Sequence, residues 1–231
     1  DIDIACSAMW ADTKRVCEQA GLRTHETGVA HGTITVISGD SAFEVTTFRS
    51  DGRYKDGRHP DSVTFVSSIE EDLARRDFTI NAMAWRPECG LIDPFGGRAD
   101  MERGLIRAVG DPRERFAEDA LRILRACRFS AELGYAIEPC TYQGMLENKG
   151  LLSKISAERV THELQKLLLG AHAGDALLGC VDALSAALPE LVAMKGFDQQ
   201  TPYHIYDVLE HTARVVDGVP PYPLVRWAAL F

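Results

Sequence analysis

The sequence predicts an α/β head with a mixed sheet, followed by an all-α neck and body. Two β-branched and aromatic runs, Thr33–Ser38 and Phe43–Phe48, are separated by a Gly-Asp pair, which is typical of a hairpin turn. Ser7–Ala20 has the apolar spacing of an amphipathic helix. Beyond residue 100 the apolar residues recur at helical spacing. These observations place the sheet first and the helices after it.

The helical part contains four candidate helices: Glu118–Leu133, Ser156–Leu169, Asp175–Leu188 and Tyr206–Val216. Before them, Arg49–Asp61 has two Gly, one Pro and many charges but almost no apolar residues, which predicts a mobile loop. A breaker cluster at Asp93–Gly97 (DPFGG) precedes the change of pattern. We therefore expect a head over residues 1–100, a helical neck over 101–170 and a helical body over 171–231.

The composition describes an ordinary folded protein. Hydrophobic residues make up 45% and charged residues 26% of the 231 residues. No apolar run approaches the ~18 residues that cross a bilayer, and no signal-peptide pattern opens the chain. The six cysteines contain no C-x-x-C pair, which argues against a zinc ribbon or a disulfide framework and suits a reducing compartment. We expect a cytoplasmic protein without a membrane segment.

The net charge of −9 is unevenly distributed. Residues 49–128 contain 15 of the 25 Lys and Arg and 15 of the 34 Asp and Glu, so this stretch is neutral and rich in arginine. Arginine suits phosphates and base edges, although on charge alone an ordinary mixed surface is the favoured explanation. The charge therefore permits nucleic-acid binding and does not demonstrate it.

Three acidic residues are candidates for a metal site. Asp1 and Asp3 alternate along an extended segment, so both carboxylates face one side, and Glu44 lies in a strand that can pair beside them. Hard oxygen ligands at this spacing suit Mg²⁺ that bridges to substrate phosphates. An isolated D-x-D is more often a solvated pair, and Glu44 is the residue that favours a metal site.

A second polar cluster runs directly into apolar residues at Arg75–Ala84 (RRDFTINAMA), and by composition it also fits a charged turn before a core segment. With this cluster, the chain resembles the class II tRNA nucleotidyltransferases, or CCA-adding enzymes, and the bacterial poly(A) polymerases. The resemblance is carried in order by Asp1–Ser7 (DIDIACS), His31–Val36 (HGTITV), Glu44–Arg49 (EVTTFR), Arg75–Ala84, Asp93–Gly97 and Gly110–Phe129 (GDPRERFAEDALRILRACRF).

The resemblance implies a nucleotidyltransferase palm and a reaction. In the implied reaction, CMP and AMP from CTP and ATP are added without a template to the 3′ end of tRNA, with Mg²⁺ as cofactor. The resemblance further implies that the RNA 3′-hydroxyl attacks the α-phosphate and that pyrophosphate leaves. The partners implied are therefore tRNA, CTP and ATP, and no oligomeric state is indicated.

The resemblance also assigns roles by position. Asp1 and Asp3 match the metal-binding aspartates, and Glu44 matches the third acidic residue of that site. The residues implied in nucleotide binding are Arg76 and Asp77 for the ribose and phosphates, Asp119 and Arg122 for the base, and Asn81 and Arg125 in support. The flexible loop linked to adenosine addition corresponds to Arg49–Phe65 and includes Arg53, Arg58, His59 and Asp61.

Spacing offers a reason why Asp119 and Arg122 would read a base. On a helix, residues three apart have neighbouring side chains. Aspartate accepts and arginine donates hydrogen bonds, so the pair complements the amino donor and ring-nitrogen acceptor of cytosine and adenine. Uracil and guanine present the reverse pattern. The ordinary alternative is a surface salt bridge.

Several alternatives stay open. Glu26–Gly28 followed by His31–Thr33 favours the CCA-adding branch, and the rivals on the same fold are a poly(A) polymerase and an enzyme that adds only A. From other classes, a non-catalytic RNA-binding module and an HD phosphohydrolase are candidates. Tyr203–Val216 resembles the first helix of an HD domain, with His211 at a metal-ligand position. We expect a fragment clipped at both ends, with an incomplete head and a truncated HD-like region.

Overall fold

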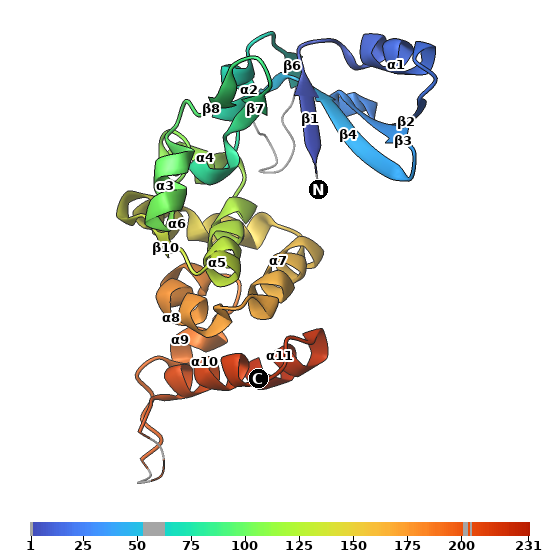
Figure 1. Cartoon of the computed structure of the whole chain (residues 1–231). Helices are drawn as coiled ribbons and strands as arrows, with labels where there is room; N and C mark the ends of the chain where they lie inside the picture. Colours follow the sequence, from blue (N-terminus) through green and yellow to red (C-terminus); the bar gives the residue numbers. More distant parts are fainter. Residues whose placement is uncertain (1, 53–62, 201–202, 204) are drawn as a thin grey trace. The chain divides into compact units, whose positions relative to one another are not determined.

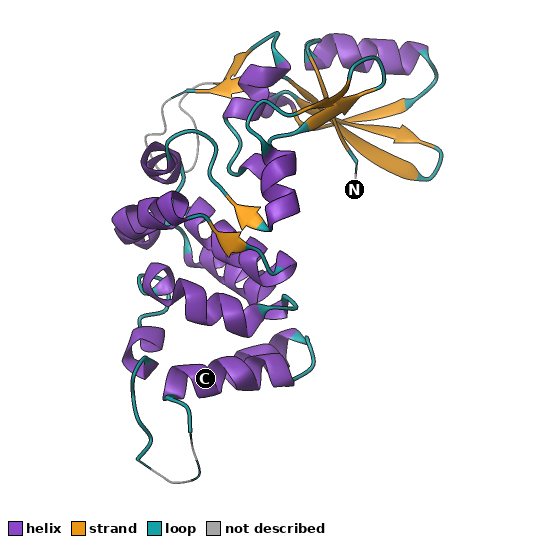
Figure 2. Ribbon diagram, turned by 60° about the vertical axis from the view of Figure 1, so that its left-hand side comes forward, coloured by secondary structure: helices purple, strands orange, loops and turns teal. Residues whose placement is uncertain are grey.

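A computed structural model describes residues 2–52, 63–200, 203 and 205–231 (Figure 1). The described residues form two compact units, and the division falls between Arg76 and Asp77. The first unit contains a mixed sheet with helices, and the second is largely helical (Figure 2). The predicted fold class is confirmed. No helix among the described residues combines the length and apolar character needed to cross a bilayer.

The first unit is built on a four-stranded sheet with strand order β1-β4-β3-β2. β1 runs parallel to β4, whereas β3 is antiparallel to both β4 and β2, so the sheet is mixed. The predicted hairpin is β3 and β4. The sequence did not predict β2, whose segment RTHETG lacks an apolar pattern. The strands are β1 (Asp3–Cys6), β2 (Arg23–Gly28), β3 (Thr33–Ser38) and β4 (Ser41–Thr47), with the short helix η1 (Val29–His31) between β2 and β3.

The two faces of this sheet differ. Helix α1 (Trp10–Gln19) packs on one face (Figure 1), where Ile34, Val36 and Val45 form a small apolar core. Because side chains alternate along a strand, Glu44 projects from the opposite face, together with its register partner Thr35. One face is therefore apolar and covered by α1, and the other presents polar side chains.

The segment after β4 contains a second small sheet. β5 (Arg49–Asp51) pairs antiparallel with β6 (Val63–Phe65), and α2 (Ile69–Ala74) follows. The predicted loop over Arg49–Asp61 is therefore wrong at its start, because its first three residues form β5, which pairs with β6. Gly52 lies in no helix or strand, and the remainder of that prediction, including Arg53, Arg58, His59 and Asp61, lies outside the described residues.

In the second unit, α5 packs against α7 and α8, and α8 packs against α10, around one apolar core. Leu164, Leu167 and Leu168 of α7 are buried as their spacing predicted. The elements are η2 (Thr79–Asn81), β7 (Ala84–Arg86), β8 (Gly90–Ile92), α3 (Gly97–Arg103), β9 (Leu105–Ile106), α4 (Pro112–Glu118), α5 (Leu121–Leu133), β10 (Ala136–Ile137), α6 (Pro139–Asn148), η3 (Lys149–Lys154), α7 (Ala157–Leu169), α8 (Ala173–Leu184), α9 (Glu190–Met194), α10 (Val208–Gly218) and α11 (Pro223–Leu230).

Gly97 begins α3 at a close approach to the backbone of η2. A Cβ added there would lie 2.1 Å from the Thr79 carbonyl oxygen, which is well inside van der Waals contact. We expect Gly97→Ala to lower the free energy of unfolding by about 1–3 kcal/mol. Gly179→Ala is the control, because a Cβ in that part of α8 would meet nothing within 4 Å. Denaturant titration should show no loss for the control, and equal losses in both variants would contradict the packing argument.

Candidate functional site

Asp3 and Glu44 lie side by side on the open face of the first unit's sheet. The register of β1 with β4 pairs Asp3 with Glu44, and the register of β4 with β3 pairs Glu44 with Thr35. Both acidic residues are exposed, and the three residues line a cavity of about 620 Å³. The structure confirms that the strand of Glu44 pairs beside that of Asp3. The role of these carboxylates in chemistry stays a prediction.

The donor set of this face fits a hard divalent cation. Two carboxylates on neighbouring strands supply the oxygen ligands that Mg²⁺ takes in proteins. Asp1, the third predicted ligand, lies outside the described residues. Within the described ranges no group of three or more His, Cys, Asp or Glu side chains is placed to hold a metal. The described part of the site is therefore the Asp3–Glu44 pair.

Arg76 lies beside an acidic residue that the sequence did not single out. Asp72 of α2 is 1% exposed, and its Oδ2 is 3.6 Å from Nη2 of Arg76. Arg75 makes a closer ion pair with the same carboxylate, at 3.0 Å. In the sequence, Asp72 is the last of three consecutive acids in the stretch EEDLARR. Nothing local distinguishes it from its two exposed acidic neighbours, Glu70 and Glu71.

Asp77, Asn81 and Arg125 form one network in the second unit. Oδ2 of Asp77 accepts hydrogen bonds from Nε and Nη2 of Arg125, at 2.7 and 2.6 Å. Oδ1 of Asp77 accepts from the backbone N–H of Phe78 at 2.8 Å and from Nδ2 of Asn81 at 3.1 Å. Asp77 is only 7% exposed, so its carboxylate is held in one orientation. The structure thus brings together three of the residues predicted for nucleotide binding.

The predicted helix over Glu118–Leu133 is interrupted at its start. α4 ends at Glu118, α5 begins at Leu121, and Asp119 between them has an extended backbone with φ −142° and ψ 104°. Its Oδ1 accepts a hydrogen bond from the backbone N–H of Leu121 at 3.0 Å. An acidic side chain that bonds to a following N–H favours a new helix start. The prediction that Asp119 and Arg122 lie three apart on one helix is therefore wrong.

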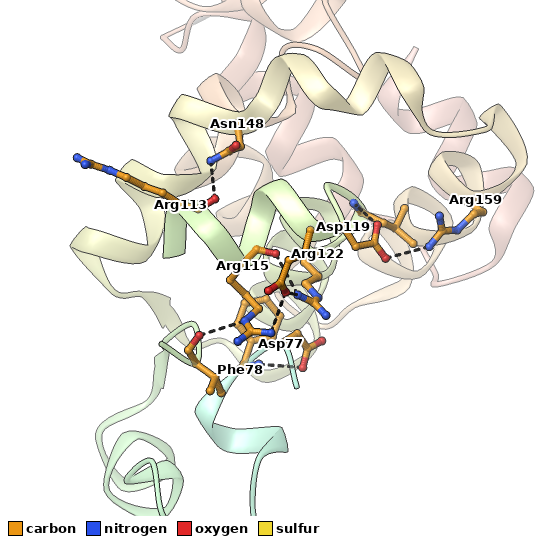
Figure 3. Close-up of polar contacts among 11 residues, drawn as sticks. Asp77, Phe78, Arg113, Arg115, Asp119, Arg122, Asn148 and Arg159 are labelled. Carbon is orange, nitrogen blue, oxygen red and sulfur yellow. Dashed lines mark hydrogen bonds and ion pairs between the residues drawn. The ribbon is translucent and has the colours of Figure 1, made fainter. Parts of the chain in front are cut away.

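Asp119 and Arg122 have different partners (Figure 3). Oδ2 of Asp119 accepts from Nη2 of Arg159 on α7, at 3.1 Å. Nη1 of Arg122 donates to Oε2 of Glu118 at 2.5 Å and to the backbone oxygen of Arg115 at 3.0 Å. The side chains of Asp119 and Arg122 are 17% and 10% exposed. Both charged groups are therefore partly buried and held by their neighbours.

Sequence reasoning missed Arg115, Glu118 and Arg159. The spacing of Glu118 and Arg122 is a signal that could have predicted their ion pair, since residues four apart are neighbours across one helical turn. Arg159 had no such signal, because it reaches Asp119 only through the packing of α7 on α5.

Two protein-family models match the chain. One, described as the poly(A) polymerase head domain, matches residues 1–107. The other, described as a probable RNA- and SrmB-binding site of polymerase A, matches residues 134–194. The first match includes Asp3, Glu44, Arg76 and Asp77, and the second includes Arg159.

The chain is also similar to proteins named CCA-adding enzyme. It is 50% identical to the one from Limosilactobacillus fermentum over 182 residues, which is 79% of this chain and 44% of that protein. It is 50% identical to the one from Geobacillus stearothermophilus over 192 residues, which is 83% of this chain and 46% of that protein.

A solved structure described as the Bacillus stearothermophilus CCA-adding enzyme in complex with CTP matches with a TM-score of 0.76 and 42% identity. The match covers 94% of this chain and 48% of that one. The chain thus spans less than half the length of these relatives. On its sequence and its fold, the chain belongs to the poly(A) polymerase head-domain family, which includes the CCA-adding enzymes.

Proposed function

We propose that this protein adds CMP and AMP from CTP and ATP to the 3′ end of tRNA, which builds or repairs the terminal CCA. The observation that carries the proposal is the pairing of Asp3 with Glu44 on the open face of the sheet. A pure binding module gains nothing from neighbouring carboxylates that repel RNA phosphates. The identity to CCA-adding enzymes favours this branch over a poly(A) polymerase.

The proposed chemistry is attack of the RNA 3′-hydroxyl on the α-phosphate, with release of pyrophosphate. Asp3 and Glu44, with Asp1, would hold Mg²⁺, which when bound activates the hydroxyl and offsets the charge that develops on the phosphates. The place of Asp3 and Glu44 on paired strands supports this role, because regular elements hold functional groups more rigidly than loops do.

We assign the other predicted residues to the incoming nucleotide. Arg76 and Asp77 serve its ribose and phosphates, and Asp119 and Arg122 read its base. We infer that Asn81 and Arg125 fix the carboxylate of Asp77, and the network of these three residues supports that role. We also propose that residues 49–65 serve adenosine addition, as the family resemblance implies.

The domain division and the location are proposals as well. We propose a head over residues 1–100, a neck over 101–170 and a body over 171–231, and the head-domain family match over residues 1–107 supports the first boundary. We propose a cytoplasmic location, which the six free cysteines support.

A primer-extension assay tests the proposed function. The complete protein is incubated with Mg²⁺ and a tRNA that ends before CCA. We expect addition of C from CTP alone, completion of CCA from CTP with ATP, and little addition from ATP alone. Addition of A only to a tRNA that already ends in CC would indicate an A-adding enzyme, and long A tails would indicate a poly(A) polymerase. Tight tRNA binding without any incorporation would support the binding module instead.

A further inference from the structure

Asp72 is a buried carboxylate that contacts both arginines of the turn after α2. Its Oδ1 accepts hydrogen bonds from Nε and Nη2 of Arg75, at 3.1 and 3.0 Å. The same oxygen accepts from the backbone N–H of Arg49, the first residue of β5, at 3.1 Å. Its Oδ2 lies 3.6 Å from Nη2 of Arg76. A single buried acid therefore joins α2, β5 and two guanidinium groups.

Packing alone does not explain this arrangement. Burying a carboxylate is costly unless it is paired and hydrogen-bonded, and a well-packed apolar residue often stabilises a protein as much as a buried ion pair does. Leu73 beside it is fully buried and packs the apolar side of α2. The charge of Asp72 is therefore better explained by what it does to its partners.

Its two arginine partners differ in exposure. The side chain of Arg75 is 19% exposed, and that of Arg76 is 34% exposed. Arg75 is thus tied more closely to Asp72 and is more covered. Arg76 is partly exposed to solvent, while its Nη2 lies beside the buried carboxylate, and this contact restricts the orientation of its planar guanidinium group.

We propose that Asp72 is a positioning residue that orients Arg76 toward the phosphates of the incoming nucleotide. This inference rests on the proposed function, which gives Arg76 its contact with the nucleotide. An arginine with a long flexible side chain loses rotamer freedom when it binds a phosphate. An anchor that restricts the side chain beforehand reduces that loss and strengthens nucleotide binding.

Asp72→Asn isolates this role. Asparagine keeps one oxygen, which accepts from Arg49 and Arg75, and puts an amide nitrogen where Oδ2 faces Arg76. The amide nitrogen of asparagine and the guanidinium of Arg76 are both donors, so the contact between residues 72 and 76 is lost. The hydrogen bond from the backbone N–H of Arg49 in β5 is kept. Asp72→Glu is the second variant, because it keeps the charge and moves the carboxylate by one methylene.

Steady-state incorporation of CMP and AMP is measured for the complete protein, Asp72→Asn, Arg76→Ala and the double variant. We expect Asp72→Asn to raise KM for both nucleotides at least about fivefold, with kcat and KM for tRNA within about threefold. Asp72→Glu should raise the nucleotide KM by less. The double variant should match Arg76→Ala within about twofold, because Asp72 acts through Arg76. Asp12→Asn is the matched control: it loses an exposed pair with Arg15, 2.7 Å long, and should behave as the unchanged protein.

The outcomes separate the two proposals. If the unchanged protein incorporates neither nucleotide, the proposed function fails and the positioning role fails with it. If the unchanged protein is active and a folded Asp72→Asn variant keeps its nucleotide KM, only the positioning role is overturned. The positioning role is also overturned if the increase in nucleotide KM in the double variant is the product of the increases in Asp72→Asn and Arg76→Ala. A joint loss of kcat, tRNA affinity and melting temperature, which would indicate a purely structural residue, overturns it too.

Discussion

Asp3→Ala is expected to abolish nucleotide addition while tRNA binding is largely retained. In the proposed function the reaction depends on a metal held by carboxylates, and removal of the Asp3 carboxylate should lower kcat by about 10³-fold or more. Proteins contact RNA phosphates mainly through arginine and lysine side chains, so under the same proposal the dissociation constant for tRNA should change by less than about threefold. Single-turnover incorporation with saturating Mg²⁺ and a tRNA-binding titration measure the two quantities.

The stability of this variant separates function from folding. Asp3 is exposed and lies beside another carboxylate, so its removal relieves repulsion with Glu44. We expect the free energy of unfolding to change by no more than about 0.5 kcal/mol. Asp12→Ala, which removes an exposed acid from α1, is the control and should keep full activity. Near-normal turnover in Asp3→Ala would show that the metal assignment is wrong.

The sequence predicted the acidic pair because the signals are local. Alternation along β1 and the two-residue turn between β3 and β4 fix which side chains share a face. Once β4 is placed beside β1, Glu44 lies on the same face of the sheet as Asp3, its register partner. The stretch at β2 carries no such pattern, and its place in the sheet follows only from hydrogen bonding to β3.

Other parts of the candidate site depend on packing between distant segments. Asp72 differs from the exposed Glu70 and Glu71 because it is buried and accepts a hydrogen bond from the backbone N–H of Arg49 in β5. The break at Asp119 is stabilised by a hydrogen bond to Leu121 and by an ion pair with Arg159 from another helix. The spacing of apolar residues predicts one helix over Glu118–Leu133, because this spacing contains no information about either contact.

The separation of Asp119 from α5 changes the physical basis of the proposed base selection. The position of Asp119 is not set by helical spacing, because hydrogen bonds from Arg159 and from the backbone N–H of Leu121 hold its carboxylate. Arg122 is held by Glu118 and by the backbone of Arg115. A carboxylate and a guanidinium that are each fixed and partly buried form a more selective pair than two flexible surface groups, because a mismatched base cannot be accommodated by rotation.

Asp119→Ala should therefore weaken selection against UTP and GTP. Cytosine and adenine each present an amino donor beside a ring-nitrogen acceptor, which complement the carboxylate and the guanidinium. Uracil and guanine present a carbonyl beside an N–H, so each contact becomes acceptor against acceptor or donor against donor. Each mispaired group costs about 1–3 kcal/mol, and removing the carboxylate should reduce the preference for CTP over UTP by about 10- to 100-fold in kcat/KM.

Competition between CTP and UTP during incorporation measures this preference. Asp182→Ala is the matched control, because it removes an aspartate whose side chain is 48% exposed and paired with Lys195 at 3.0 Å in the same unit. The control should retain the full preference. The carboxylate of Asp119 also holds Arg159, so circular dichroism and thermal unfolding must show that the variant is folded. A folded Asp119→Ala protein that rejects UTP as strongly as the unchanged protein would rule out base reading by Asp119 and leave it as a structural link between α5 and α7.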